Sequence, residues 1–260
     1  TAAPAYSPTK GAGVKLFTMR LKVKSTATVG ATSVVNITTG NNYSFANYAS
    51  NNGFTPPSDK SFTMSAAAAP AATLISVASR KVHSTTAAAT TPAFDFVFWQ
   101  TSFGAIPVSV AAAAPVKTEP RTAVNAGAVG TAGHQIVFKY SAAVSGTPVV
   151  TTAVGTASNV VAVGDEVRFM LTGVPDMSRV LVTVNGVGDD KSVAIGFLQG
   201  NVNSFTTANM QVNSTDIGQV KGQSLVTVTS ANFVFDVNAS GVINSTDIGL
   251  VKGKSLNQLP

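Results

Sequence analysis

Hydrophobic and polar residues alternate near the beginning of the chain. In residues 14–24 the side chains of Met19, Leu21 and Val23 take every second position, and basic residues stand between them. A period of two places successive side chains on opposite faces of a strand. The pattern predicts a half-buried strand with a basic outer face, followed by a second strand at Ser33–Thr38.

Short apolar runs separated by turn residues fill residues 73–199. Many short strands at this spacing are typical of an immunoglobulin-like β-sandwich. Residues 111–133 are rich in Ala, Gly and Pro and are expected to form a long surface loop. The predicted strands are Thr73–Ser79, Phe94–Trp99, Ile106–Val110, Gln135–Ser141, Val149–Thr152, Val160–Val163, Glu166–Thr172, Val180–Val187 and Lys191–Gly196.

The chain divides at an uncharged, alanine-rich stretch. Residues 66–72 read Ala-Ala-Ala-Ala-Pro-Ala-Ala, and we expect them to be a semi-extended linker. Residues 1–65 then form a partial β unit, residues 73–199 a β-sandwich, and residues 200–260 a small α-helical module. The predicted fold class is mainly β: two β-sandwich units followed by the helical module.

Composition agrees with a mainly β chain and narrows the functional classes. Charged residues make up 11% of the sequence, and the net charge of +6 is scattered. A nucleic-acid interface needs a concentrated basic stripe, so no nucleic-acid partner is expected. The sequence has no cysteine, which excludes disulfides and thiolate chemistry. It has no apolar run of about 18 residues, so no membrane-spanning helix is expected either.

One internal repeat stands out in residues 200–260. The segment Asn213–Gly222 recurs as Asn244–Gly253 with nine of ten residues identical, at an offset of 31 residues. Such a duplication indicates two small units, neither of which buries a core alone, that pack against each other.

Oxygen-bearing residues precede the second copy at the spacing of a 12-residue calcium loop. Gly241 at position 6 permits the sharp turn, and Ile243 at position 8 is expected to point into a small core. The last ligand stands at the start of a helix. The alternative is a polar turn that ends in an Asp-capped helix. The predicted calcium ligands are Asp236, Asn238, Ser240, the carbonyl of Val242, Asn244 and Asp247.

The first copy has a poorer set of oxygens. Asn201, Asn203 and Asp216 correspond to positions 1, 3 and 12, but the intervening segment is about four residues too long and lacks the glycine. We expect weak calcium binding there, or an ion-free loop held by hydrogen bonds.

The tandem loop–helix units resemble a type I dockerin over about 60 residues. In that family the residues at loop positions 10 and 11 help to select a cohesin partner. The resemblance therefore implies calcium as cofactor and a cohesin-like domain as partner. The alternative is that these Ser and Thr residues only start helices well. The implied partner contacts are Ser214, Thr215, Lys221, Ser245, Thr246 and Lys252.

The beginning of the chain, Leu16–Gly30, is similar to the late strands of a cohesin-like sandwich. Residues 1–65 would then be a partial cohesin-like unit, and residues 73–199 resemble the sandwich that precedes the dockerin in large secreted bacterial proteins. The chain begins with Thr1, and we expect any export signal to have been removed. These resemblances imply a secreted, extracellular protein at a bacterial cell surface.

Residues typical of catalysis are few. His83 and His134 are far apart in sequence and are expected at turns or on the surface. A glycosidase pair remains an alternative, as does a sugar platform at Trp99, although core packing is the simpler interpretation of that strand. The candidate carboxylates are Asp95, Asp165, Glu166, Asp176, Asp189 and Asp190.

The leading hypothesis is a non-catalytic structural protein that assembles with further copies of itself into a filament, or attaches to a surface complex. Cohesin-like, dockerin or strand-complementation contacts would hold it there. The alternatives are a carbohydrate-binding adhesin module, with a polysaccharide as partner, and a dockerin-tagged polysaccharide-active enzyme.

Overall fold

The computed structural model divides the chain into two compact units, residues 1–69 and residues 70–260. In the first unit, strand β1 (Thr32–Val35) pairs antiparallel with β2 (Lys60–Thr63). β1 covers the first part of the strand predicted at Ser33–Thr38. The residues that the structure describes are 32–35, 60–63, 72–87, 91–112, 114, 116–203 and 210–260.

Two predictions fall largely beyond these ranges. The strand at residues 14–24 and the linker residues 66–71 lie outside the described residues. Of residues 1–65, which the sequence predicts to be a partial cohesin-like unit, only the strands β1 and β2 are described.

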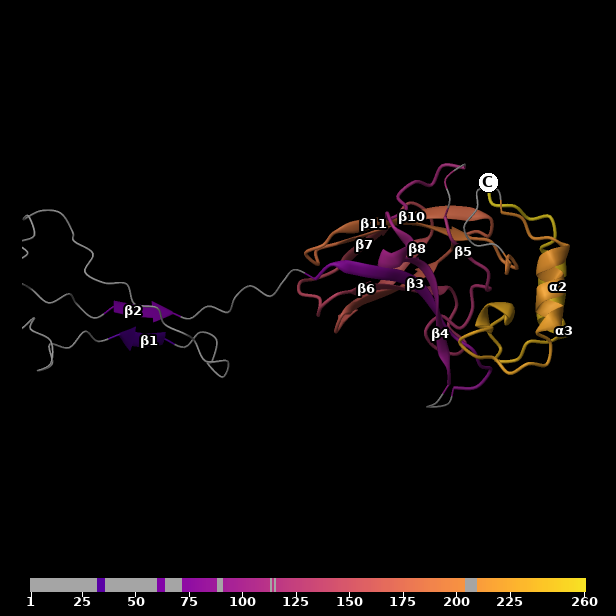
Figure 1. The fold of residues 1–260 in the computed structure, drawn as a ribbon, viewed down its shortest axis with the longest axis horizontal. Helices are drawn as coiled ribbons and strands as arrows, with labels where there is room; N and C mark the ends of the chain where they lie inside the picture. The colour runs from indigo at the N-terminus through magenta and orange to yellow at the C-terminus, as the bar shows by residue number, and fades with distance from the viewer. Residues whose placement is uncertain are drawn as a thin grey trace, which may run out of the picture. The chain divides into compact units, whose positions relative to one another are not determined.

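Residues 70–260 contain two sheets, which Figure 1 shows as two layers. A five-stranded antiparallel sheet has the order β4-β3-β6-β9-β8, and a four-stranded sheet has the order β5-β11-β10-β7, with β5 parallel to β11. The fold is therefore mainly β. The strands are β3 (Leu74–Val82), β4 (Ala93–Gln100), β5 (Thr118–Glu119), β6 (His134–Tyr140), β7 (Val149–Thr152), β8 (Thr156–Val163), β9 (Glu166–Thr172), β10 (Ser178–Asn185) and β11 (Lys191–Phe197).

Alternate residues of the two sheets form one hydrophobic core. Ile136 and Phe138 of β6 share it with Val180 and Val182 of β10, and none of the four is exposed. The period of two in the sequence thus directs one face of each strand inward. Burying side chains of this size contributes about 1.5–3 kcal/mol each to folding.

The strand predictions at Val149–Thr152 and Glu166–Thr172 are confirmed to the residue. The strand predicted at Ile106–Val110 is wrong, because that segment has no regular structure. Pro107 stands inside it and has no N–H to donate to a ladder. Its carbonyl accepts one hydrogen bond, from the Ala194 amide at 2.7 Å.

The long surface loop predicted at residues 111–133 is present only in part. The segment is mostly irregular, and Ala111, Val124 and Gly130 are exposed. Its middle is not a surface loop, because it contains β5, and Thr118, Glu119 and Arg121 are completely buried. A composition rich in Ala, Gly and Pro is typical of loops, but the pairing of buried polar groups holds residues 118–121 inside.

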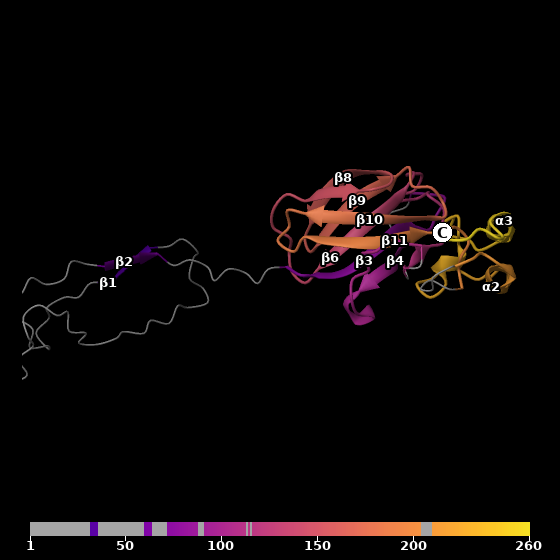
Figure 2. The same ribbon diagram turned by 90° about the horizontal axis from the view of Figure 1, so that it is seen from above.

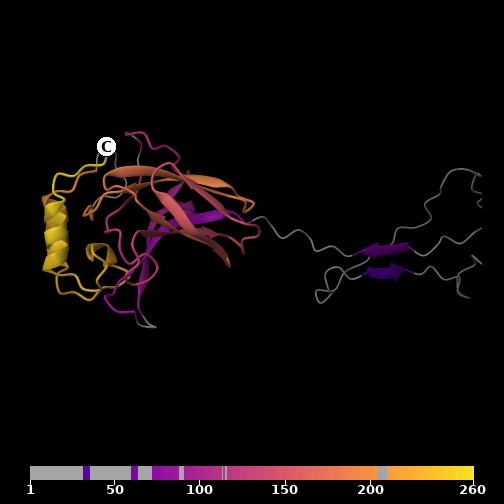
Figure 3. The ribbon, with the colours of Figure 1, turned by 180° about the vertical axis from the view of Figure 1, so that it is seen from behind.

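The C-terminal part contains helix α2 (Ser214–Gly222), the short 3₁₀ helix η2 (Phe233–Phe235) and helix α3 (Ser245–Gly253). Figures 2 and 3 show both α-helices at the end of the two sheets that also carries the C-terminus. Each helix begins with a capping box, in which an Asn side chain accepts from the backbone and the Asp three residues later accepts in return. The helix predicted to start around Asp247 is confirmed.

The two helices pair antiparallel. The Leu225 amide, just after α2, donates to the carbonyl of Ile243 before α3, and the Leu256 amide after α3 donates to Val212 before α2, both at 2.9 Å. These two bonds join positions that are equivalent in the repeat, so the repeat units are related by an approximate two-fold axis. The pairing of two units that the duplication predicts is therefore present.

The helices also pack onto the sheets. Leu198, which follows β11, belongs to a second hydrophobic core together with Val220 of α2 and Val251 of α3. The Thr122 amide donates to the Val237 carbonyl at 2.8 Å. The predicted boundary between residues 199 and 200 thus falls inside one compact unit. Within the described ranges, no helix is long and apolar enough to cross a membrane.

Candidate calcium loop and the buried charge network

The loop from Asp236 to Asp247 gathers oxygen atoms around one turn. The Ser240 amide donates to Asp236 Oδ1 and to Asn238 Oδ1, at 3.0 Å each. Ser240 Oγ lies 3.2 Å from the carbonyl oxygen of Val242. The oxygens at positions 1, 3, 5 and 7 of the predicted calcium loop therefore lie close together.

The carboxylate of Asp247 closes the loop from the helix side. Its Oδ1 accepts from the Asn238 amide at 3.1 Å and its Oδ2 from the Asn244 amide at 3.0 Å. Burial raises the pKa of Asp247, the hydrogen bonds from Asn244 and Asn238 oppose this, and repulsion from Asp236 adds to it. Neither carboxylate has any exposed surface. Two buried like charges in one loop favour a cation between them.

The residues therefore fit a hard cation, which takes its ligands from carboxylate, amide, hydroxyl and main-chain oxygens. Asn244 Oδ1 accepts from the Thr246 amide at 2.7 Å, so this predicted ligand also caps α3. Among the described residues, no cluster of three or more His, Cys, Asp and Glu side chains is placed to hold a metal ion. The loop supplies two carboxylates, so the predicted calcium binding also depends on the neutral oxygens of the loop.

In the first loop the final Asp accepts from backbone amides as in the second, but the loop has fewer charges. Asp216 Oδ1 accepts from the amides of Val202 and Asn203, at 2.8 and 3.1 Å, as Asp247 does from Asn238. Asn201 stands where the second loop has Asp236, and its Nδ2 donates to Thr118 Oγ1 at 3.1 Å. With one carboxylate in place of two, any ion there is expected to bind weakly.

The predicted partner contacts all lie at the surface. Gly218 and Gly249 lie in the middle of the helices that carry them, and a Cβ added at either glycine would meet no atom within 4 Å. In α2, a helical period places Ser214, Gly218 and Lys221 on one face. The exposed predicted contacts are Ser214, Thr215 and Lys221 in α2 and Ser245, Thr246 and Lys252 in α3.

Two exposed leucines follow these helices. Leu225 is 87% exposed with φ 69°, and Leu256 is 75% exposed with φ 73°. They are 31 residues apart, at matching positions just beyond the two copies of the repeat. They lie outside the repeat as defined by Asn213–Gly222 and Asn244–Gly253, but extending each copy by three residues includes them.

A buried ion pair lies between the helices and the sheets. Arg121 donates from Nε and Nη2 to the two carboxylate oxygens of Glu119, at 2.7 and 2.9 Å. Its remaining N–H groups are directed at the carbonyls of Ser79 and Phe94 and at Nε2 of His83. All five donors of the guanidinium therefore have acceptors. Burial acts to raise the pKa of Glu119, but the charge and hydrogen bonds of Arg121 hold it well below its usual value.

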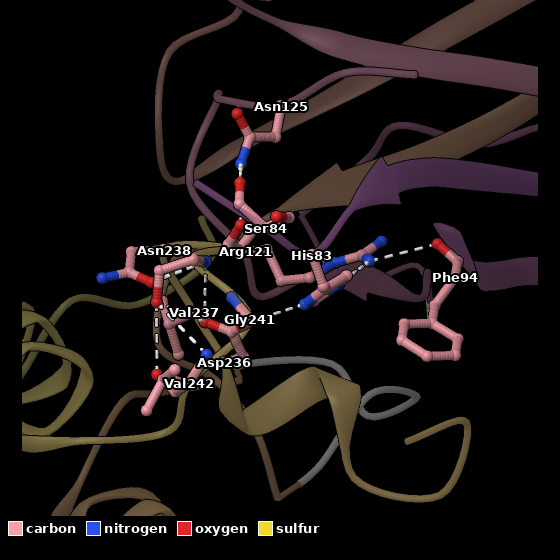
Figure 4. A network of polar contacts seen from close by, with 12 residues as sticks. His83, Ser84, Phe94, Arg121, Asn125, Asp236, Val237, Asn238, Gly241 and Val242 are labelled. Carbon is pink, nitrogen blue, oxygen red and sulfur yellow. Dashed lines mark hydrogen bonds and ion pairs between the residues drawn. The ribbon is translucent and has the colours of Figure 1, made fainter. Parts of the chain in front are cut away.

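His83 joins Arg121 of this ion pair to Asp236 of the predicted calcium loop, as Figure 4 shows. Its Nε2 lies 3.1 Å from Arg121 Nη1, and its Nδ1 lies 2.8 Å from Asp236 Oδ2. A guanidinium only donates, so Nε2 is the acceptor and Nδ1 carries the hydrogen that binds Asp236. Burial lowers the pKa of His83, which agrees with this neutral form, although the bond to Asp236 opposes the shift. We call Glu119, Arg121, His83 and Asp236 the buried charge network.

The expected surface position of the two histidines is therefore wrong. His83 is 2% exposed and His134 is 4% exposed. The His83 ring packs edge-on against Phe94 and Phe233, and the His134 ring lies 4.6 Å from that of Phe197. An isolated histidine in a sequence carries no signal of the aromatic rings and charges that the fold brings to it.

The carboxylates considered for glycosidase chemistry each have a structural partner. Asp95 and Glu166 both bind Arg80. The others bind Lys139 (Asp165), Lys254 (Asp176), Lys191 (Asp189) and the Gly186 amide (Asp190).

Trp99, considered as a sugar platform, is 5% exposed, and its Nε1 donates to the Gly104 carbonyl at 3.0 Å. It contributes instead to the wall of an apolar pocket of about 640 Å³ that Phe103, Pro107 and Lys117 also line.

Comparison with known proteins gives no match. No protein-family model, no curated protein and no solved structure is similar enough to this chain to be matched.

Proposed function

We propose that this protein is a non-catalytic extracellular assembly protein, and that residues 200–260 are its dockerin-like, calcium-binding docking module. The observation that carries the proposal is the duplicated exposed face of α2 and α3. Each copy presents a Ser-Thr pair, a mid-helix glycine, a lysine and an exposed leucine at matching positions.

The leucines at positive φ and the glycines within the helices lower the stability of the folded chain, and they face solvent and not its core. A leucine in the left-handed backbone region costs about 1–2 kcal/mol, and a glycine inside a helix costs about 1 kcal/mol relative to alanine. Leu225 and Leu256 are mostly exposed, and Gly218 and Gly249 face open space. Their occurrence at both copies argues for a partner that packs a leucine side chain and approaches the helix backbone closely at the glycine.

The antiparallel helices give this surface two similar ends. The carbonyl of Val212, two residues before α2, accepts from the Leu256 amide, so Ser214 and Thr215 lie near that leucine. By the approximate two-fold axis, Ser245 and Thr246 lie near Leu225. A cohesin-like domain is the proposed partner, supplied by a second copy of this protein or by another surface protein. Contacts that run head to tail between copies would build a filament.

Calcium would serve this surface by holding the loop that starts α3. When bound, the ion supplies positive charge between the carboxylates of Asp236 and Asp247. Asn238, Ser240 and the Val242 carbonyl would complete its shell. The ion would thereby fix the start of α3, where Ser245 and Thr246 lie.

The proposal is tested by size-exclusion chromatography and electron microscopy of the purified chain with calcium or with a chelator. Calcium-dependent oligomers or filaments are expected, and the double change Leu225→Ser and Leu256→Ser should abolish them. Met177→Ser is the matched control, because Met177 is also apolar, 41% exposed and at positive φ, but lies in the turn before β10. A strict monomer in every condition would overturn self-assembly.

The pocket beside Trp99 favours a second candidate, a carbohydrate-binding adhesin module. Phe103 is 50% exposed at the pocket, and Lys117 Nζ lies 4.7 Å from the centre of its ring. An exposed aromatic ring next to a donor is suited to a sugar face. A glycan array with the native chain and with Phe103→Ala tests this candidate. Binding that disappears in the variant supports it, and no binding by the native chain removes it.

A further inference from the structure

Asp236 is the first ligand of the proposed calcium loop, yet its support comes from two distant parts of the chain. Oδ1 accepts from Ser240, and Oδ2 accepts from Gly241 at 2.7 Å within the loop. Oδ2 also accepts from His83 Nδ1 at 2.8 Å, and His83 directly follows β3 of the five-stranded sheet. The partners are 153 residues apart in sequence, and both side chains are completely buried.

The His83 ring is fixed by a hydrogen bond at Nε2 and by two aromatic rings. Arg121 fixes Nε2 as the acceptor, and the guanidinium is anchored by both oxygens of Glu119. The rings of Phe94 and Phe233 pack edge-on against the imidazole, at 5.3 and 5.8 Å. Arg121 therefore sets the tautomer of the His83 ring, and two aromatic rings, Phe94 of β4 and Phe233 of η2, set its orientation.

The loop is shaped to accept this contact. Gly241 has φ 89°, and a Cβ at that position would lie 2.8 Å from the His83 carbonyl. The Ser84 amide donates to the Ala239 carbonyl, and Asn125 Nδ2 donates to the same oxygen at 2.7 Å. Figure 4 shows Ser84, Asn125 and His83 approaching the loop together. The backbone of the loop is thus pinned beside the carboxylate that His83 binds.

We infer that His83 is a positioning residue for the proposed calcium site, so that the sheets supply part of the site and residues 200–260 do not form it alone. The inference rests on the proposed calcium function. A group that hydrogen-bonds to a metal ligand without contacting the metal sets the orientation of the ligand oxygens and the charge on them. Removing such a group typically weakens metal binding about 10- to 100-fold.

The experiment measures calcium affinity by isothermal titration of the full chain and of His83 variants, with unfolding of each in chelator recorded separately. His83→Phe keeps a ring among the aromatic neighbours and removes the donor, and a loss of about 10- to 100-fold in affinity is expected. His83→Asn retains an N–H near the position of Nδ1, and should keep most of the affinity. His83→Gln places its amide near Nε2 instead, and should behave like the Phe variant.

His134→Phe is the matched control, because this histidine is equally buried and its Nδ1 has no hydrogen-bond partner in the part of the chain that the structure describes. Its calcium affinity should equal that of the native chain. If His83→Phe does not fold, the contrast between the Asn and Gln variants decides the question.

The failures are distinguishable. A native chain that binds no calcium overturns the proposed calcium function. A native chain that binds calcium, with His83→Phe and His83→Gln binding equally well, overturns the inference alone. Equal weakening by His134→Phe also overturns it, since that would be a general effect of disturbing the core.

Discussion

Arg121 and Glu119 form a two-point ion pair in which neither side chain is exposed to solvent. Arg121→Met should lower the free energy of unfolding by about 3–5 kcal/mol, because it leaves the Glu119 carboxylate buried and unpaired. Adding Glu119→Gln should recover part of the loss. Urea unfolding of the single and double variants measures both effects.

An exposed ion pair provides the control for this measurement. Lys139 and Asp165 lie 3.2 Å apart, with side chains 44% and 45% exposed. Asp165→Asn should change the free energy of unfolding by less than about 1 kcal/mol. Equal losses from Arg121→Met and Asp165→Asn would contradict the role assigned to burial.

Lys81 should make stability depend on pH above neutrality. Its Nζ donates to the carbonyls of Val124 and Gly133 at 3.0 and 3.1 Å, which a neutral amine satisfies with two hydrogens. Burial lowers its pKa to about 7; Glu119 opposes this and Arg121 adds to it. Between that pH and about 10.4, the unfolded chain binds a proton that the folded chain lacks. Stability should therefore rise with pH in this window, by at most about 1.4 kcal/mol per pH unit.

Urea midpoints at pH 7, 8 and 9 measure this slope in the native chain and in Lys81→Met. The Met variant should show a flatter dependence, because it has no proton to release. The same slope in both proteins would show that Lys81 stays charged in the folded chain.

Glycine-to-alanine changes should raise the stability of the chain within the helices and lower it in the loop before α3. Gly218→Ala and Gly249→Ala should each raise stability by up to about 1 kcal/mol, because alanine favours the helix and meets no atom. Calorimetry should show a midpoint about 2–4 °C higher for each. Gly241→Ala should lower the midpoint, since its φ of 89° strains alanine and its Cβ would touch the His83 carbonyl.

The same helix variants bear on the proposed docking face. If a partner approaches the backbone at Gly218 and Gly249, the added methyl groups should weaken assembly while they stabilise the chain. A gain in stability with unchanged assembly would place the partner elsewhere.

Calcium should bind at one strong site per chain. The second loop has two buried carboxylates, while the first loop has Asn201 in place of Asp236. Asp236→Asn should remove the heat of calcium binding, and Asn203→Ala should leave it nearly unchanged. Calcium at about 100 times its dissociation constant should stabilise the native chain by about 2.7 kcal/mol, measured as a shift of the unfolding midpoint. Two equally strong sites would contradict this difference between the loops.

The sequence predicted correctly those strands and helix starts that depend on residues close together in the chain. The short apolar run between turn residues predicted β9 at Glu166–Thr172 to the residue, and the repeated Asn-Ser-Thr-Asp placed the start of α3. Both depend on neighbours a few residues away, through the period of a strand and the hydrogen bonds of a helix cap. The strand predicted at Ile106–Val110 is absent. Strand propensity favours these residues, but Pro107 has no N–H to donate to a β-ladder.

The buried charge network could not be predicted in the same way. Glu119 ends β5, Arg121 and His83 follow β5 and β3, and Asp236 lies in the C-terminal loop. Only Asp236 belongs to a motif of the sequence, and the other three each resemble an ordinary surface residue. Arg121 and Glu119 lay in a segment that its composition assigned to a surface loop, and His83 was expected at a turn. The cost of burying each is offset only by the partner that the fold brings to it, which no local pattern contains.

The sequence by itself therefore determined the mainly β character, the duplicated helix start and the spacing of the oxygens from Asp236 to Asp247. Only the tertiary structure decided that Asp236 of the predicted calcium loop is hydrogen-bonded to His83, that the helix pair shares a core with the sheets, and that Leu225 and Leu256 remain exposed. The physical reason is range: periodicity and capping act within a few residues, whereas burial and charge pairing depend on which distant residues meet.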